Sequence, residues 1–256
     1  MNIKIASINL QSGVATTRGF WHYALTGWKY WLPHSNRPIK ACGDFLKKEN
    51  IDIACVNEIS ESSLMTGWRS QTETLSDATN MKHTHFFSTA VPFKKLRDEG
   101  NAILSVHPIT STASHPLHKE LFNCSLDEAV ISVQGKSITV LTTHLALTKK
   151  HRDIQIREII ELVKVKTGPI ILSGDFNEPD PAAFDELRAV TPLKQLCTLP
   201  TFPSWKPTKS LDYIFLSEEF NQVGPMTRSD LGLGQTYNSN PVFSDHVPLV
   251  VEVELI

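Results

Sequence analysis

The chain is poor in cysteine, and its few cysteines are scattered. There are four among 256 residues, at positions 42, 55, 124 and 197, and no two form a CxxC pair. A disulfide framework of the kind that stabilises small secreted domains is therefore not indicated. Cys55 lies in an apolar run and is expected to be a buried free thiol.

Long hydrophobic runs are also lacking. No stretch approaches the 18 or so apolar residues of a membrane-spanning helix. The first residues, MNIKIASINL, read as a strand rather than as the apolar core of a signal peptide. We expect a cytoplasmic location by default, with secretion by a signal-independent route left open.

The chain has no marked excess of either charge. Its formal net charge is -2 and its pI about 6.5, whereas proteins that coat nucleic acid through their overall field are usually basic. The HExxH motif of zinc hydrolases and the DxH and GNH[DE] motifs of dinuclear phosphoesterases are absent. An enzyme with a local basic rim remains compatible with this composition.

Many short apolar runs alternate with a few helical patterns. Helices are expected over about 38–50, 71–82 and 148–166, and a hairpin is expected to turn at Gln134-Gly135-Lys136. This mixture favours an α/β sandwich in which two sheets pack face to face under helices, formed as one domain over residues 1–256.

Polar residues recur where the apolar runs end. Carboxylate, amide and imidazole groups delivered from strand ends predict a divalent-metal site for a phosphate ester. The residues concerned are Asn9, Glu58, His144, Asp175, Asn177, Asp212, Asp245 and His246.

Each of these residues also has a structural interpretation. Asp175 suits proton transfer from water and Asn177 the stabilisation of an oxyanion, but a lone GDxN is more often an Asx-turn. Asp212, inside an apolar strand, needs a partner such as a histidine. Taken one at a time the structural interpretations are favoured. Taken together, they require too many coincidences.

The order of these motifs resembles the endonuclease/exonuclease/phosphatase superfamily, over nearly the whole chain. Its motifs appear here as VNE at 56–58, EGNAILS at 99–105, TTHL at 142–145, GDFN at 174–177, LDYIF at 211–215 and SDH at 244–246. The resemblance implies a four-layered α/β sandwich of the DNase I type, with two mainly antiparallel sheets. The stretches at 25–34 and 201–207 further resemble a bacterial subgroup without an assured substrate.

The resemblance also implies roles. Glu58 would be the principal ligand of Mg²⁺ or Mn²⁺, assisted by Asn9 and Asp245 directly or through water. Asp175, with Asn177 beside it, would activate the attacking water. His246, oriented by Asp212, and His144 would contact the phosphate. Asn101 would lie near the substrate, and Glu99 or Asp98 would support a histidine. Asn57 stands where the family usually has glutamine, which affects local hydrogen bonds.

The substrate follows less directly. Lys149, Arg152 and Trp205 border the predicted site as candidate substrate contacts, and the aromatic segment 20–34 suits base stacking, a lipid interface or simple packing. We expect in-line attack of water on a phosphodiester, with nucleic acid favoured. The alternatives are a phospholipid head group, an inositol phosphate or other small phosphomonoester, and, more remotely, a non-catalytic binding module. A monomer without a stable protein partner is expected.

Overall fold

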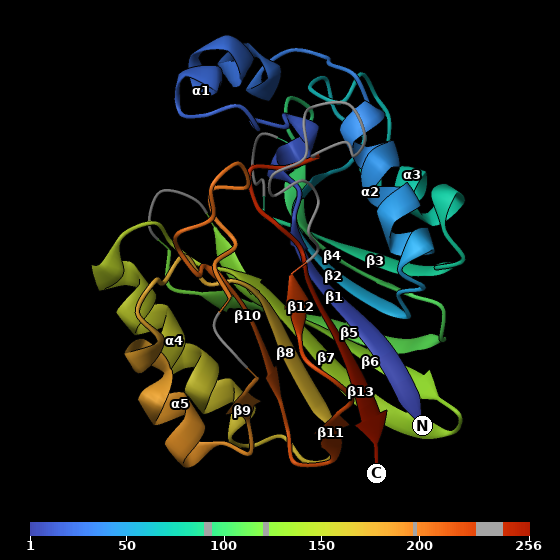
Figure 1. Ribbon diagram of the computed structural model, residues 1–256, viewed down its shortest axis with the longest axis vertical. Coiled ribbons are helices and arrows are strands. Elements are labelled where there is room, and N and C mark those ends of the chain that lie inside the picture. Colours follow the sequence, from blue (N-terminus) through green and yellow to red (C-terminus); the bar gives the residue numbers. More distant parts are fainter. Residues whose placement is uncertain (90–93, 120–122, 197–198, 229–242) are drawn as a thin grey trace.

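The computed structural model describes residues 1–89, 94–119, 123–196, 199–228 and 243–256. Its strands form two sheets (Figure 1). The first has the order β11-β13-β1-β2-β4-β3, with β12 also paired to β13, and the second has the order β5-β6-β7-β8-β10-β9. The β1–β2 and β7–β8 pairs are parallel, and the other pairings of the described strands are antiparallel.

The elements have the following bounds. The strands of the first sheet are β1 (Asn2–Asn9), β2 (Ile53–Ser60), β3 (His83–Ser88), β4 (Glu99–Ser105), β11 (Phe220–Gln222), β12 (Thr227–Arg228) and β13 (Leu249–Leu255). Those of the second are β5 (Ile109–Leu117), β6 (Cys124–Val133), β7 (Lys136–His144), β8 (Ile170–Asp175), β9 (Lys194–Gln195) and β10 (Asp212–Leu216). The α-helices are α1 (Trp21–Thr26), α2 (Arg37–Lys48), α3 (Gln71–Ala78), α4 (Lys149–Val163) and α5 (Asp185–Val190), and the 3-10 turns are η1 (Gln11–Gly13), η2 (Gly27–Tyr30) and η3 (Pro181–Phe184).

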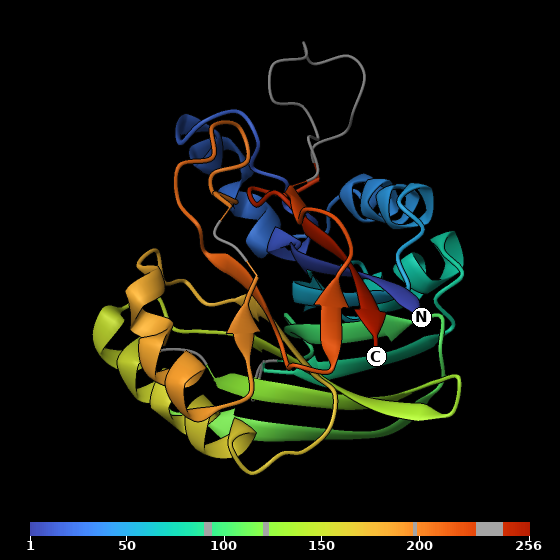
Figure 2. The ribbon, with the colours of Figure 1, turned by 60° about the horizontal axis from the view of Figure 1, so that its bottom comes forward.

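Three apolar clusters separate four layers, as the sequence predicts. The central cluster lies between the sheets and includes Ile5, Cys55 and Ile171. A second packs α2 and α3 on the outer face of the first sheet, and a third packs α4 and α5 on the outer face of the second. Figure 2 shows the two helical layers on opposite sides. The fold is therefore a DNase I-like α/β sandwich, and Cys55 is buried and free as predicted.

The local predictions are largely confirmed. The β6–β7 hairpin turns at Gln134-Gly135, and both residues have the positive φ that a tight hairpin turn requires. The α4 helix begins directly after Thr148, although the threonine side chain makes no capping hydrogen bond. The predicted helix at 71–82 is shorter, because Thr79 has extended backbone and ends α3. Within the described residues, no helix has both the length and the apolar character needed to cross a membrane.

Candidate active site

Neighbouring strands of the second sheet deliver three side chains to one edge. His144 ends β7, Asp175 ends β8 and Asp212 begins β10. In the sheet register His144 pairs with Asp175, and Asp175 pairs with Asp212. Pairing of adjacent strand ends thus explains why residues far apart in the chain meet here.

The first sheet contributes Asn9 and Glu58. Glu58 lies in β2 where the pairing with β4 shifts at a β-bulge, and its φ is +48°. Such a bulge re-aims a side chain, and left-handed backbone at a non-glycine residue is typical of functional sites. Asn9, at the end of β1, donates through Nδ2 to Glu58 Oε1 and to Asp175 Oδ2, both over 2.9 Å.

The orientation of Asn9 gives it a positioning role. Its Oδ1 accepts a hydrogen bond from the backbone N–H of Gln11 over 2.9 Å, which fixes the amide so that the nitrogen faces the two carboxylates. Asn9 therefore holds Glu58 and Asp175 in place. That Asn9 assists at the metal, directly or through water, stays a prediction.

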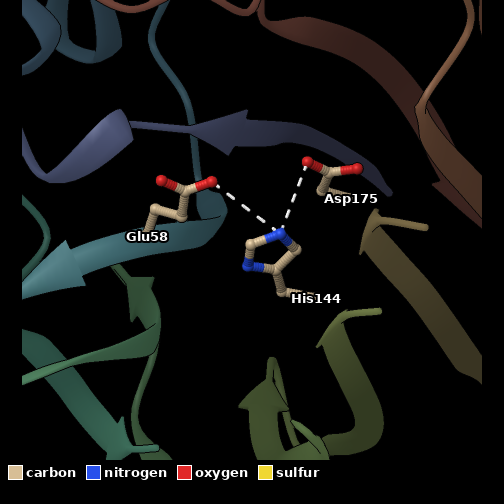
Figure 3. Close-up of side chains that lie close together, drawn as sticks. All are labelled: Glu58, His144 and Asp175. Atoms are coloured by element: carbon tan, nitrogen blue, oxygen red, sulfur yellow. Dashed lines mark ion pairs between the residues drawn. The ribbon is translucent and has the colours of Figure 1, made fainter. Parts of the chain in front are cut away.

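Asp175 lies between two imidazoles. Its Oδ2 is 3.8 Å from His144 Nε2 and 3.7 Å from His246 Nε2. Figure 3 shows the Glu58 and Asp175 carboxylates turned toward the ring nitrogen of His144, which is also 3.8 Å from Glu58 Oε1. These separations exceed hydrogen-bond length, so the Nε2 positions are free to contact a phosphate or a water.

His246 is held by a carboxylate on its other side. Its Nδ1 donates to Asp212 Oδ2 over 2.8 Å, and both side chains are buried. Burial alone would lower the pKa of His246, but the carboxylates of Asp212 and Asp175 raise it well above its ordinary value. The carboxylates therefore favour the protonated ring of His246, which can donate from Nε2 to a phosphate oxygen.

The donor set fits a hard divalent cation. One ligand atom each from Glu58, His144 and Asp175 lies within 4.8 Å of the other two. Burial raises the pKa of Glu58 to about 7, and the nearby carboxylates of Glu99 and Asp245 act in the same direction, against the opposing effect of His144. The negative charges of these carboxylates repel one another, and a bound Mg²⁺ or Mn²⁺ would offset that repulsion.

Asp245 lies apart from that group. Among the described residues, it belongs to neither of the two sets of possible ligands that come together. Its Oδ2 accepts a hydrogen bond from the Tyr23 hydroxyl over 2.5 Å. Burial raises the pKa of Asp245, and the pKa of Tyr23 is raised in turn by its own burial and by this carboxylate. If Asp245 takes part in metal binding, the position of its carboxylate depends on Tyr23, which donates to it.

The geometry of GDFN differs from the extended chain that we expected. The strand ends at Asp175, and Asn177 has a φ of +50°. The backbone N–H of Asn177 donates to Asp175 Oδ1 over 2.8 Å, which is the hydrogen bond of an Asx-turn, while its Nδ2 donates to the Leu145 carbonyl. The turn and a catalytic role for Asp175 are compatible, because the turn fixes the carboxylate.

Two of the predicted substrate contacts, Asn101 and Arg152, are buried side chains. Asn101 is buried and lies between Asn57, whose Nδ2 donates to it, and Asp127, to which it donates. Arg152 is buried and donates from Nη2 to Glu178 over 3.0 Å and from Nη1 to the Leu147 carbonyl. Both side chains have partners inside the protein: Asn101 links strands β2, β4 and β6, and Arg152 links α4 to Glu178 and to the Leu147 carbonyl.

The other peripheral predictions have mixed outcomes. Lys149 is exposed on the first turn of α4 and pairs with Asp153. Trp205 is half-buried beside Phe20 and Tyr23. Glu99 and Asp98 do not support a histidine: Glu99 contacts Arg97 and Ser12, and Asp98 accepts from Ser88 over 2.5 Å.

Sequence reasoning missed the importance of Asn57. It is buried in the first sheet, yet its Oδ1 accepts from the backbone N–H of Asp175 and its Nδ2 reaches Thr142, both in the second sheet. One amide thus bridges the sheets directly beneath the site. Its position next to Glu58, on the opposite side of the strand, was the available signal.

Comparison with known proteins agrees with this geometry. Residues 6–246 match the model of the Endonuclease/Exonuclease/phosphatase family. The chain belongs to this family. Members of this family are phosphoric ester hydrolases.

Relatives within the family are distant. The chain is 30% identical to YbhP of Escherichia coli K12 over 174 residues, which cover 61% of this chain and 63% of YbhP, so the match spans less than two thirds of that relative. An endonuclease/exonuclease/phosphatase from Beutenbergia cavernae superimposes with a TM-score of 0.71 at 19% identity, over 99% of this chain and 72% of that one. D. rerio TDP2, complexed with a single-strand DNA product, gives 0.70 at 15% identity over 99% of both chains.

Proposed function

We propose that the protein is a divalent-metal-dependent phosphodiesterase that uses a single in-line attack of water. The observation that carries the proposal is the placement of Asp175 Oδ2, which faces both His144 Nε2 and His246 Nε2. One carboxylate flanked by two ring nitrogens provides a proton acceptor beside two groups that can bind phosphate.

Asp175 serves as the proton acceptor for the attacking water. Hydrogen bonds from Asn9 Nδ2 and from the Asn177 backbone N–H hold its two oxygens in place. Because these donors fix the direction of the carboxylate, the base needs no reorganisation as the reaction begins.

His246 and His144 receive the negative charge that develops on the phosphate. The Asp212 carboxylate keeps the His246 ring protonated and oriented, so Nε2 presents a charged donor. His144 presents its Nε2 from the neighbouring strand end, and it is more exposed than His246. A charged donor at His246 and a second ring nitrogen at His144 suit the equatorial oxygens of a phosphorus centre under attack.

Glu58, which lies beside Asp175 and His144, is the carboxylate that would hold Mg²⁺ or Mn²⁺. The bound cation would supply Lewis-acid stabilisation of the phosphate charge. Asn9 keeps Glu58 aligned, and the bulge in β2 directs the glutamate toward the site.

Hydrolysis of bis-p-nitrophenyl phosphate with Mg²⁺, with Mn²⁺ and with EDTA tests this proposal. Asp175→Ala and His246→Ala are each expected to lower kcat by about 10²-fold or more, the scale of a general base or a charge-stabilising donor. Asp153→Asn, which alters only an exposed pair on α4, is the matched control and should keep full activity. Turnover in EDTA, or near-normal turnover of either site variant, would contradict the mechanism.

Nucleic acid and phospholipid head groups both contain phosphodiesters. The similarity to TDP2 with its DNA product supports the first, although at 15% identity it speaks chiefly for the fold. The net charge of -2 gives a nucleic-acid substrate little support. The exposed aromatic segment beside the site favours a phospholipid head group.

A further inference from the structure

The segment that contains α1 and η2 turns its most apolar side chains outward. Trp21, Leu25, Trp28 and Leu32 recur at intervals of four, three and four residues, which places them on one face of a helical segment. All four side chains are half or more exposed. Phe20 and Trp31, at 68% and 73%, are exposed beside them.

The opposite face of the same segment carries side chains with hydroxyl groups, and these face the protein. Tyr23 bonds to Asp245, Thr26 is buried and bonds to Thr16, and Tyr30 packs under the Arg97 guanidinium at 5.1 Å. A surface helix of a soluble protein normally shows the reverse arrangement, with its apolar face toward the core. The inversion leaves these apolar side chains half or more exposed.

A second turn extends this surface. Gly67 lies against Pro33, and Arg69 donates to the His34 carbonyl over 3.1 Å, so residues 63–69 adjoin the end of the aromatic segment. Trp68 is 60% exposed there. Figures 1 and 2 show α1 at one end of the molecule, while the two termini lie together at the other end of the sheets.

The sequence segment that carries this surface has basic but no acidic residues of its own, and Asp245 contacts it on its inner side through Tyr23. Residues 1–43 contain no aspartate or glutamate, in a chain whose net charge is -2. They contain five basic residues, Lys4, Arg18, Lys29, Arg37 and Lys40. A surface built in this way is complementary to an anionic partner.

The mixture of side chains distinguishes between anionic partners. Single-stranded nucleic acid is bound by stacking on aromatic platforms along a basic groove. Here leucines alternate with the tryptophans, and leucine cannot stack on a base. Tryptophan and leucine on one face with lysine and arginine near it are typical of segments that lie in a membrane interface.

We propose that the face formed by Phe20, Trp21, Leu25, Trp28, Trp31 and Leu32 docks the protein on an anionic phospholipid bilayer. The face is continuous with the active site. Phe20 and Tyr23 pack on Trp205, Trp205 packs on Phe202, and the Phe202 ring lies 5.0 Å from that of His246. This inference rests on the proposed function: a phosphodiesterase that docks on a bilayer in this way has the phosphodiester of a lipid head group as its substrate.

The tryptophans make the test direct. The chain has five, and four of them, at positions 21, 28, 31 and 68, are half or more exposed on or next to this face, with Trp205 behind it. Intrinsic fluorescence is therefore measured while vesicles of phosphatidylcholine, with or without phosphatidylglycerol, are added. A blue shift that needs phosphatidylglycerol, and quenching by brominated acyl chains, are expected.

Leu25→Ser/Leu32→Ser keeps every tryptophan and removes two aliphatic anchors. It is expected to weaken vesicle binding about tenfold or more. Val165→Ser/Val190→Ser changes two equally exposed apolar residues outside the face and should bind as the wild type does. Both double variants should hydrolyse bis-p-nitrophenyl phosphate at the wild-type rate, which shows that they are folded.

Three results would overturn the docking proposal. These are fluorescence unchanged by vesicles, equal binding of both double variants, and a fluorescence change produced by a single-stranded oligonucleotide alone. Vesicle binding without phosphodiester hydrolysis would contradict the proposed function and leave docking intact. Hydrolysis without vesicle binding would contradict docking alone.

Discussion

His246 donates from Nδ1 to Asp212 Oδ2 over 2.8 Å; Asp212 begins β10, and His246 lies 34 positions later in the segment before β13. The bond fixes which ring nitrogen faces Asp175, and the negative charge of Asp212 keeps the ring protonated. A carboxylate–histidine pair of this kind is the usual way in which a protein orients an imidazole.

Asp212→Asn tests the value of that pair. The amide keeps the shape but removes the charge, so the pKa of His246 should fall and the ring should lose its proton at a lower pH. We expect kcat to drop about 10²-fold, with the alkaline limb of the kcat–pH profile displaced to lower pH. An unchanged alkaline limb would show that protonated His246 is not the group that limits activity there.

Metal affinity should depend on pH through Glu58. Burial and neighbouring carboxylates raise its pKa to about 7, and only the ionised carboxylate can bind the cation. Raising the pH from about 6 to about 8 should therefore tighten Mg²⁺ binding roughly tenfold, as measured by calorimetric titration. Glu58→Gln should bind more weakly and lose this dependence. Equal Mg²⁺ affinity of the wild type at both pH values would remove Glu58 as a ligand.

Arg152 is expected to act on stability instead of substrate binding. Its ion pair with Glu178 is buried, and Arg152→Met would leave the glutamate without its charged partner. The free energy of unfolding in urea should fall by about 3–5 kcal/mol, with KM little changed in the folded fraction. Lys149→Ala, which removes the neighbouring exposed pair, is the control and should leave stability unchanged. A raised KM without loss of stability would restore Arg152 as a substrate contact.

Gly174 is required by the close approach of β7. Its φ is +151°, and a Cβ there would lie 2.1 Å from the Thr143 carbonyl oxygen. Gly174→Ala should therefore cost about 3 kcal/mol, because the parallel β7–β8 pair must separate next to Asp175. Gly168→Ala changes a glycine that also has positive φ but has open space around it, and should cost only about 1 kcal/mol. Similar losses in urea unfolding would show that the clash is relieved without cost.

The strand ends are what made the site predictable. An apolar run bounded by a carboxylate or an imidazole, as beside His144, Asp175 and Asp212, indicates a buried strand that reaches the edge of a sheet. The four layers were predictable for a similar reason, since apolar stripes on residues 37–48 and 149–163 require a sheet face to cover.

Contacts between distant segments could not be predicted from the sequence. The Tyr23–Asp245 bond and the bridge from Asn57 to Asp175 join residues more than 100 positions apart through tertiary packing. Local chemistry gave no means of pairing Arg152 with Glu178, so an arginine beside the site was interpreted as a phosphate contact. The left-handed backbone of Glu58 and Asn177 likewise depends on the bulge and turn that surround them.

The stereochemistry of hydrolysis at phosphorus tests the central claim most directly. A P-chiral phosphorothioate diester is hydrolysed in ¹⁸O-labelled water, and the configuration of the product is determined. A single in-line attack by the water that Asp175 activates predicts inversion, with one labelled oxygen incorporated. Retention of configuration would require a covalent intermediate on the protein and would contradict the account.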